Sequence, residues 1–278
     1  MSAQLKKILV TGANQGIGLA LVKRLATEKD CFVYLGCRDL ARGQTAKQTL
    51  VQDFPSLAEL IEVVEIDVTK METIEALAQS FQSNNVSLYA LVNNAGVGLN
   101  APGNVLDVNY EGLKRVTTAM LPFVTNRIVN VSSGAASMWL RNQDADTQRI
   151  FTSPTSLEEL DAAVAEKAPK MDDFGIYGLS KAANTALTIL HAQQHPKLII
   201  TSLSPGYVET RMTSTFQGNK LTPEQGCVSL LKCLFDDTVT SGWYYGSDGL
   251  RSPLTCTRDP GTPEYQGEAN PDPKVYNK

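Results

Sequence analysis

The segment VTGANQGIG at residues 10–18 constrains the fold of this chain more than any other. Its first residue is also the last residue of the apolar run ILV at 8–10. It contains three glycines, at positions 12, 16 and 18, where an ordinary strand–helix connection needs at most one. Glycine allows a backbone to approach a ligand or another segment closely. A helix that begins after such a turn presents unpaired N–H groups, which form a ready anion site. Alone, the glycines would also fit a simple tight turn.

Apolar runs alternate with helix-period segments along most of the chain. The strand-like runs are residues 7–11, 32–36, 61–66, 88–92, 127–132, 197–203 and 242–245, and the helical segments include 17–28, 41–53, 71–82 and 182–192. Continuous apolar runs are typical of strands buried on both faces. The alternation predicts an α/β fold, a Rossmann-type doubly wound parallel sheet of about seven strands with helices on both faces.

Two segments interrupt this alternation. An insertion at about residues 135–173 contains a helix signature in which Ser156 and Glu159 match a capping box and Pro169 marks the end. From 251 to 278 the chain is rich in Pro, Gly and Asp without periodicity, which predicts an irregular tail, either draped over the domain or disordered. We expect residues 1–250 to form a single domain.

Composition and charge exclude several classes of function. The 278 residues carry a net charge of −4 and no basic cluster, so we expect no nucleic-acid partner. No apolar run reaches the roughly 18–20 residues of a membrane span. The residues before the first predicted strand do not have the pattern of a signal peptide, so we expect none. Five cysteines without a CxxC pair and only two histidines predict reduced thiols, no metal site and a cytoplasmic location. Both histidines are expected at the surface.

The end of the second predicted strand bears on cofactor choice. An acidic residue about 20 positions after the glycines would bind the ribose hydroxyls of NAD. Here Cys37 stands 19 residues after Gly18 and is followed by Arg38 and Arg42. Arginine binds phosphate bidentately, so this pattern favours the 2′-phosphate of NADPH. The alternative is that the arginines are solvated or pair with Asp39.

The motifs TGANQGIG, NNAG, VSS, YGLSK and SPGYVET occur in the order found in short-chain dehydrogenases/reductases. The chain resembles this family over roughly residues 7–246, and in detail its carbonyl reductase branch, which carries TGAN-x-GIG, an Arg-Asp pair after the second strand and an insertion before the catalytic tyrosine.

Tyr177 and Lys181 lie four residues apart and therefore share one helix face. Lowering a phenol pKa from 10 to about 7 requires roughly 4 kcal/mol. An ammonium about 4–5 Å away supplies about 3–4 kcal/mol at an effective dielectric constant near 20. Tyr177 would then act as general acid in carbonyl reduction. The resemblance implies that Ser133 polarises the carbonyl while Ser132 points into the sheet, and that Asn109 positions a water in a proton relay behind Lys181.

The motifs also imply a cofactor site and no metal. The residues expected to contact NADPH or NADP+ are Gly12, Asn14, Gln15, Gly16, Ile17, Gly18, Arg38, Arg42, Asp67, Val68, Asn94, Ala95, Gly96, Tyr177, Lys181, Pro205, Gly206, Val208 and Thr210. Gln15 stands where many NADPH-preferring relatives carry a basic residue. Arg38 must then do more of the discrimination between NADPH and NADH.

Two spacings differ from the family pattern. Asn93 and Asn109 are only 16 residues apart, and 44 residues separate Ser133 from Tyr177, where about 13 is usual in the family. An amphipathic helix in the longer segment needs an apolar surface to cover. We expect it to cover the face through which many relatives assemble, which predicts a monomer.

The predicted function is NADPH-dependent reduction of a ketone, aldehyde or quinone. Met138, Trp139, Tyr207 and Met212 suggest an apolar small-molecule substrate, although the first two could instead pack under the insertion. A dedicated alcohol dehydrogenase of a biosynthetic pathway and a non-catalytic NADP-sensing regulator are the alternatives.

Overall fold

A parallel sheet of seven strands forms the centre of the computed structural model, which describes residues 5–98, 104–215 and 217–277. Its order is β3-β2-β1-β4-β5-β6-β7, and every neighbouring pair is parallel. The strands are β1 (Lys7–Val10), β2 (Phe32–Cys37), β3 (Ile61–Glu65), β4 (Leu88–Asn93), β5 (Val124–Val131), β6 (Ile199–Leu203) and β7 (Tyr244–Tyr245). The predicted fold class is therefore confirmed.

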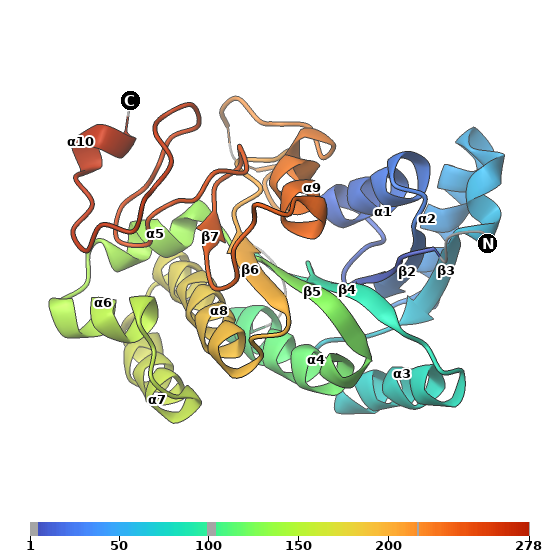
Figure 1. The fold of residues 1–278 in the computed structure, drawn as a ribbon, viewed down its shortest axis with the longest axis horizontal. Helices are drawn as coiled ribbons and strands as arrows, with labels where there is room; N and C mark the ends of the chain where they lie inside the picture. The colour runs from blue at the N-terminus through green and yellow to red at the C-terminus, as the bar shows by residue number, and fades with distance from the viewer. Residues whose placement is uncertain (1–4, 99–103, 216, 278) are drawn as a thin grey trace.

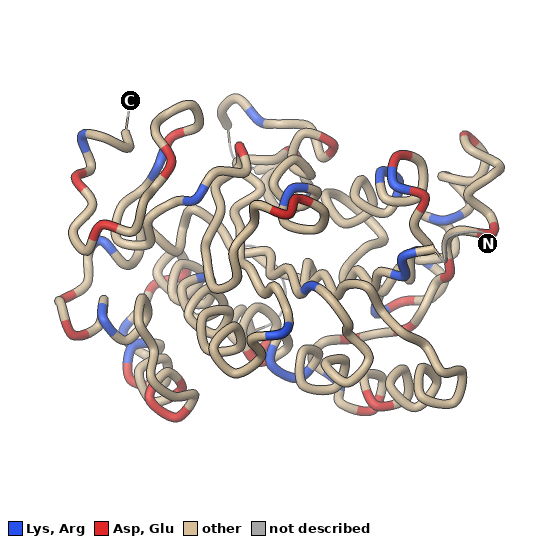
Figure 2. The backbone as a smooth tube through the Cα atoms, viewed as in Figure 1, with Lys and Arg blue, Asp and Glu red and all other residues tan. Residues whose placement is uncertain are grey.

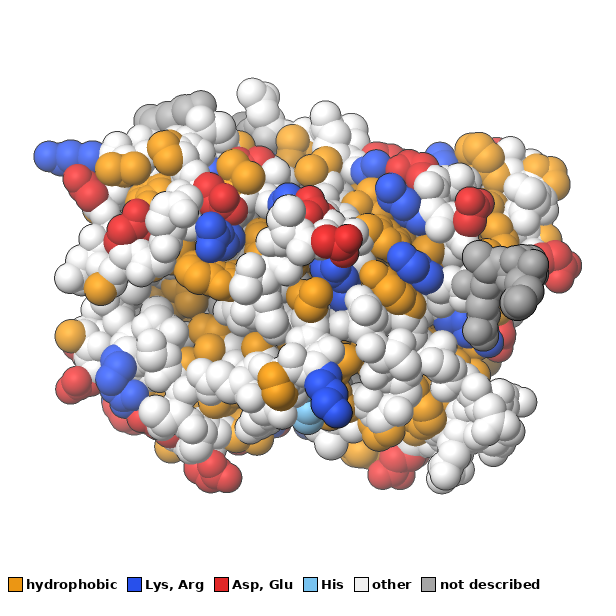
Figure 3. All heavy atoms as spheres, viewed as in Figure 1, with side chains coloured by type: hydrophobic (Ala, Val, Ile, Leu, Met, Phe, Trp, Pro, Cys, Tyr) orange, Lys and Arg blue, Asp and Glu red, His pale blue; other side chains and the backbone are white. Residues whose placement is uncertain are grey.

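Helices cover both faces of the sheet (Figure 1). On one face lie α1 (Gly16–Glu28), α2 (Leu40–Asp53) and α9 (Val228–Phe235), and on the other α3 (Met71–Ser83), α4 (Gly112–Met120) and α8 (Asp173–Gln194). Short helical turns are η1 (Pro55–Glu59), η2 (Asp107–Glu111), η3 (Leu121–Phe123), η4 (Ala168–Lys170) and η5 (Gln225–Cys227). Charges of both signs are interspersed along the outer helices and loops (Figure 2), and apolar and charged atoms alternate over the face drawn in Figure 3.

The insertion folds into three helices where the sequence predicted one. These are α5 (Gly134–Leu140), α6 (Ala145–Thr152) and α7 (Leu157–Lys167), and all three pack against α8. Ser156 caps α7 as predicted by accepting from Glu159 N, but the Glu159 carboxylate bonds to Thr155 instead of returning to Ser156. The apolar side chains of the three helices form one core with α8, which includes Phe151, Leu160, Val164 and Leu179.

Trp139 belongs to this core and not to the substrate side. It is 6% exposed, and its ring meets that of Phe151 edge-on at 5.1 Å between centroids. Its indole N–H points to Met171 Sδ at 3.4 Å. Of the two alternatives for Trp139, substrate contact or packing under the insertion, the structure has the second, because the insertion supplies an apolar partner for the indole. The neighbouring Met138 faces the other way and is 41% exposed.

The C-terminal tail is draped over the domain in its described part, residues 251–277, and ends in α10 (Pro273–Tyr276). Figure 1 shows it as the red segment that crosses above α5. Tyr265 stacks edge-on between Trp243 and Tyr276. Pro253 O accepts from Ser137 Oγ of α5, and Tyr276 is 3% exposed. Of the two alternatives for the tail, the structure has the draped one; residue 278 lies outside the described residues.

The cysteines and histidines form no cluster with acidic residues that could hold a metal within the described ranges. All five cysteines are buried free thiols. His191 corrects the expectation of a surface histidine, because its Nδ1 is enclosed without a hydrogen-bond partner. Burial and the neighbouring His195 lower the pKa of His191 to about 4. None of the helices in the described chain is long and apolar enough to cross a membrane.

Candidate active site

A cavity of about 1120 Å³ opens at the carboxyl ends of the strands, where the sheet order reverses between β1 and β4. Ligands of open parallel sheets bind at such a switch point. The glycine turn, the loops after β2, β3 and β4, the start of α5, Tyr177 and Lys181 of α8, and the loop after β6 all contribute to its wall. Except for Asn109, every residue expected to bind cofactor or act in catalysis lines this cavity.

The three glycines meet two different needs. Gly12 and Gly16 have φ angles of 62° and 55°, a left-handed conformation that strains other residues. Gly18 lies too close to its neighbours for a side chain, because a Cβ there would stand 2.5 Å from Asn94 Nδ2 and 2.7 Å from Gly12 O. No described side chain caps α1, so the first N–H groups of this helix are left for an anionic ligand.

The loop after β4 is tied to the glycine turn by four hydrogen bonds. Asn94 Nδ2 donates to Thr11 O at 2.8 Å and Gly12 O at 3.1 Å, while Thr11 Oγ1 accepts from the N–H groups of Asn94 and Ala95. Together these bonds fix the two walls of a narrow slot. Gly96 continues the wall, and a Cβ there would stand 3.4 Å from Lys181 Nζ.

The two arginines after β2 differ in their partners. Arg42 Nε pairs with Asp39 at 3.4 Å, and Asp39 also caps α2 by accepting from Arg42 N. Arg38 is exposed at the cavity and makes no hydrogen bond or ion pair with any described residue. Cys37 is buried and cannot bind ribose hydroxyls as a carboxylate would. Arg38 is therefore the available cation at this end of the cavity.

Ser133 and Tyr177 form a hydroxyl pair at the other end of the cavity. Ser133 caps α5 by accepting from Ala135 N, which fixes its side chain at the cavity wall. Burial raises the pKa of Tyr177 above its ordinary value, and a hydrogen bond with Ser133 opposes that rise. Ser132 also lines the cavity, but its hydroxyl bonds to Lys181 O and Thr185 Oγ1 of α8.

The pKa of Tyr177 is raised and not lowered, which contradicts the expectation that Lys181 brings it toward 7. Lys181 Nζ donates to Val131 O at 3.0 Å and lies 5.9 Å from the centroid of the Tyr177 ring. The side chain is 4% exposed, and burial lowers the pKa of Lys181 to about 8. Both groups have lost water, which disfavours the charged form of each.

Asn109 lies in the π-helical turn η2 and outside the cavity wall. Its Oδ1 accepts from Val97 N at 2.9 Å, and its Nδ2 donates to Val97 O and Ser180 Oγ. A Cβ on Gly96 would stand 3.2 Å from Asn109 Oδ1, so the side chain is adjacent to the wall that faces Lys181. The structure therefore shows Asn109 bracing the loop after β4, and its part in a water relay stays a prediction.

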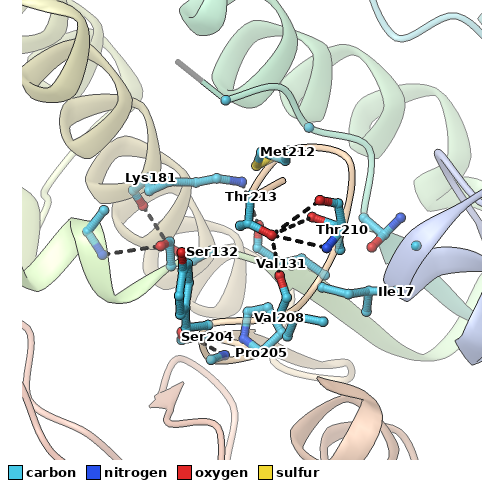
Figure 4. Close-up of a pocket in the computed structure, with 18 of the residues that line it drawn as sticks. Ile17, Val131, Ser132, Lys181, Ser204, Pro205, Val208, Thr210, Met212 and Thr213 are labelled. Carbon is cyan, nitrogen blue, oxygen red and sulfur yellow. Dashed lines mark hydrogen bonds between the residues drawn. The ribbon is translucent and has the colours of Figure 1, made fainter. Parts of the chain in front are cut away.

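The loop after β6 closes the cavity over Tyr177. Thr213 Oγ1 donates to Val208 O at 2.6 Å and accepts from Thr210 N, which holds this loop in shape (Figure 4). Met212 Sδ lies 4.0 Å from Tyr177 Oη. Further residues that no sequence motif predicted also line the cavity, among them Phe174, Ser204, Tyr244, Ser247 and Thr257. Tyr244 and Thr257 come from β7 and the tail, where no spacing rule points to a site.

Comparisons with known proteins agree with this geometry. A family model described as short chain dehydrogenase matches residues 6–145. "Carbonyl reductase [NADPH] 1" of Homo sapiens is 30% identical over 255 residues, which cover 81% of this chain and 89% of that protein. The structure of salutaridine reductase from Papaver somniferum superposes with a TM-score of 0.75 at 26% identity, covering 86% of this chain and 99% of that one. NADPH-bound carbonyl reductase from chicken fatty liver gives 0.66 at 25% identity, covering 89% and 98%.

The burial of Lys181 predicts a pH-dependent contribution to stability. Between about pH 8 and 10.5 the unfolded chain holds a proton on Lys181 that the folded chain has released. The contribution of Lys181 to the free energy of unfolding therefore rises with pH in this window. The free energy of unfolding of wild type minus that of Lys181→Met should rise by about 1–3 kcal/mol from pH 8 to 10, measured by urea unfolding. Lys70→Met, at an exposed position, is the control. If this signed difference stays constant or falls over the same pH range, this account of Lys181 is contradicted.

Proposed function

Because this chain belongs to the short-chain dehydrogenase/reductase family, we propose that it reduces a ketone, aldehyde or quinone to the alcohol with NADPH, and that Tyr177 is the general acid. One observation carries this proposal. A single cavity joins an uncapped helix N-terminus and the free Arg38 at one end to the Ser133–Tyr177 hydroxyl pair and Lys181 at the other.

The residues at the first end fit NADPH. The N–H groups at the start of α1 suit the pyrophosphate, and the unpaired Arg38 suits the 2′-phosphate. The similar human carbonyl reductase is named for NADPH, and the similar chicken carbonyl reductase has NADPH bound. When bound, NADPH would supply the hydride.

The residues at the second end would handle the proton. The raised pKa of Tyr177 keeps its phenol protonated at neutral pH, as a general acid for reduction must be. Ser133 would hold the carbonyl oxygen beside this phenol. Once Tyr177 has given up its proton, the ammonium of Lys181 on the same helix face would stabilise the phenolate.

The cavity mouth favours an apolar substrate body. Met138, Phe174, Tyr207 and Met212 line it and are between 38% and 51% exposed, so a substrate that covers them removes apolar surface from water. The likeness to salutaridine reductase supports the alternative of a dedicated biosynthetic reductase. The intact Ser133, Tyr177 and Lys181 argue against a non-catalytic NADP-sensing regulator.

The insertion supports a monomer formed by one catalytic domain. Helices α5, α6 and α7 cover α8, and Asp161 of α7 also binds Lys114 of α4 at 2.8 Å. The insertion therefore covers α8 and also contacts α4 through this ion pair. Five unpaired thiols support a reducing compartment, and we propose the cytoplasm.

Replacing Tyr177 by Phe tests the proposed chemistry. The variant should lose about 10²–10⁴-fold in kcat, because the general acid is gone while the ring still packs. The measurement is NADPH oxidation followed by absorbance with a panel of diones, quinones and aldehydes. NADPH binding, titrated by its fluorescence, should persist and serves as the control for folding. Turnover retained in Tyr177→Phe would overturn the role of Tyr177.

Replacing Arg38 by Met tests cofactor choice. The variant should raise KM for NADPH by about 10- to 100-fold, because a charge-assisted bond to the 2′-phosphate is lost. KM for NADH should change much less, since NADH lacks that phosphate. Arg42→Met is the matched comparison and should lose less, because Arg42 already pairs with Asp39. Equal losses for NADPH and NADH would contradict the assignment of Arg38.

Sedimentation equilibrium tests the proposed assembly. The full chain should sediment at the monomer mass, 30.1 kDa, across micromolar concentrations. A stable dimer or tetramer would show that the insertion does not cover the assembly face.

A further inference from the structure

A second tyrosine faces the cavity close to Tyr177. Tyr244 lies on β7, pairs in register with Ser202 of β6, and is 5% exposed. Its side chain lines the cavity and is near enough to Tyr177 for the two phenols to affect each other's ionisation. The next residue, Tyr245, points to the opposite sheet face and packs in the core under α1 and α9. β7 thus directs one of two adjacent phenols into the site.

The hydroxyl of Ser204 is the hydrogen-bond partner of the Tyr244 phenol. Ser204 Oγ accepts from Gly134 N and from Gly206 N, each at 3.2 Å, so its own proton is available to the phenol oxygen of Tyr244. Among residues 5–98, 104–215 and 217–277, Ser204 is the one hydrogen-bond partner of the Tyr244 phenol, and no group there accepts the proton of Tyr244. Burial raises the pKa of Tyr244, so this phenol remains a hydrogen-bond donor.

The tail closes this end of the cavity with Thr257, Arg258 and Asp259. The Arg258 side chain has no exposed surface and pairs with Asp248 in the turn after β7. It also donates to Ser252 Oγ and Thr262 O, both at 2.9 Å. These bonds fix Thr257 and its neighbours at the cavity wall. Asp248 already balances the guanidinium charge and Asp259 also lines this end, so a neutral oxygen suits it better than a carboxylate.

We propose that Tyr244, held by Ser204, donates a hydrogen bond to a second, uncharged oxygen of the substrate. The preferred substrate class is then a carbonyl compound with another oxygen close to the reacting carbonyl, such as a dione, a quinone or a hydroxyketone. Ser247, whose hydroxyl lines the same end, adds a second polar group there. This inference rests on the proposed function, because it uses the carbonyl position beside Ser133 and Tyr177.

Two substrates with one skeleton test the role of Tyr244. 1-Phenylpropane-1,2-dione and 1-phenylpropan-1-one differ only in the second carbonyl. Tyr244→Phe should lower the ratio of their kcat/KM values about five- to tenfold, as expected for one lost hydrogen bond. Dividing the ratio measured for the variant by the ratio measured for wild type removes the difference in intrinsic reactivity between the two substrates. Tyr245→Phe is the matched control, because it deletes the same hydroxyl on the opposite sheet face, and its ratio should equal that of wild type. An unchanged ratio in Tyr244→Phe would overturn the proposal.

Binding without turnover separates this inference from the proposed function. In the Tyr177→Phe background, the dione should bind the NADPH complex about five- to tenfold more weakly after Tyr244→Phe is added, measured by the change in NADPH fluorescence. If wild type turns over no carbonyl but this binding difference appears, the proposed function fails and the role of Tyr244 stands. If wild type is active and neither ratio nor binding depends on Tyr244, the proposed function stands and the subsite fails.

Discussion

The close approach of the glycine turn to the loop after β4 sets the geometry of the whole site. A Cβ on Gly12 would stand 2.8 Å from the Ala95 Cα, and Asn94 bonds to two carbonyls of the turn. This contact places the start of α1 and the wall formed by Gly96 on either side of one slot. Asn109 then braces that wall through Val97, and Lys181 faces it. A shift in either loop would therefore move the start of α1 relative to Ser133 and Tyr177, the proposed catalytic residues.

Desolvation governs the chemistry at the other end of the slot. Burial favours the neutral forms of both Tyr177 and Lys181. The phenol is thus protonated, which is the form that the proposed reduction needs. The negative charge that develops on a substrate oxygen would meet hydrogen-bond donors whose positions are already fixed, which stabilises it at the moment of transfer. In this structure the lysine is held by Val131 O and stays close to, but not at, the phenol.

The sequence predicted the sheet and the motif residues because local rules determine both. Buried parallel strands read as continuous apolar runs, and the turn after β1 needs glycine at a positive φ. Trp139 and Tyr244 could not be assigned in this way. The contacts of Trp139 depend on where the insertion packs, and those of Tyr244 depend on which face of a two-residue strand meets the cavity. The pKa of Tyr177 also escaped prediction, since a spacing of four residues fixes a shared helix face but not where Lys181 Nζ points.

Helix α5 links the catalytic group to the segments that shape the substrate end. Ser133 caps its first turn, and Ser137 donates to Pro253 O in the tail. On its other side α5 packs so closely on α8 that a Cβ at Gly178 would stand 2.7 Å from Trp139 Cβ. The same helix therefore connects the Ser133–Tyr177 pair, the core of the insertion and the tail that closes the polar end. These contacts share one helix, so a change in the tail acts on the position of Ser133 as well as on the shape of the pocket. Substrate preference and the geometry of the proposed catalytic residues are therefore coupled in this fold.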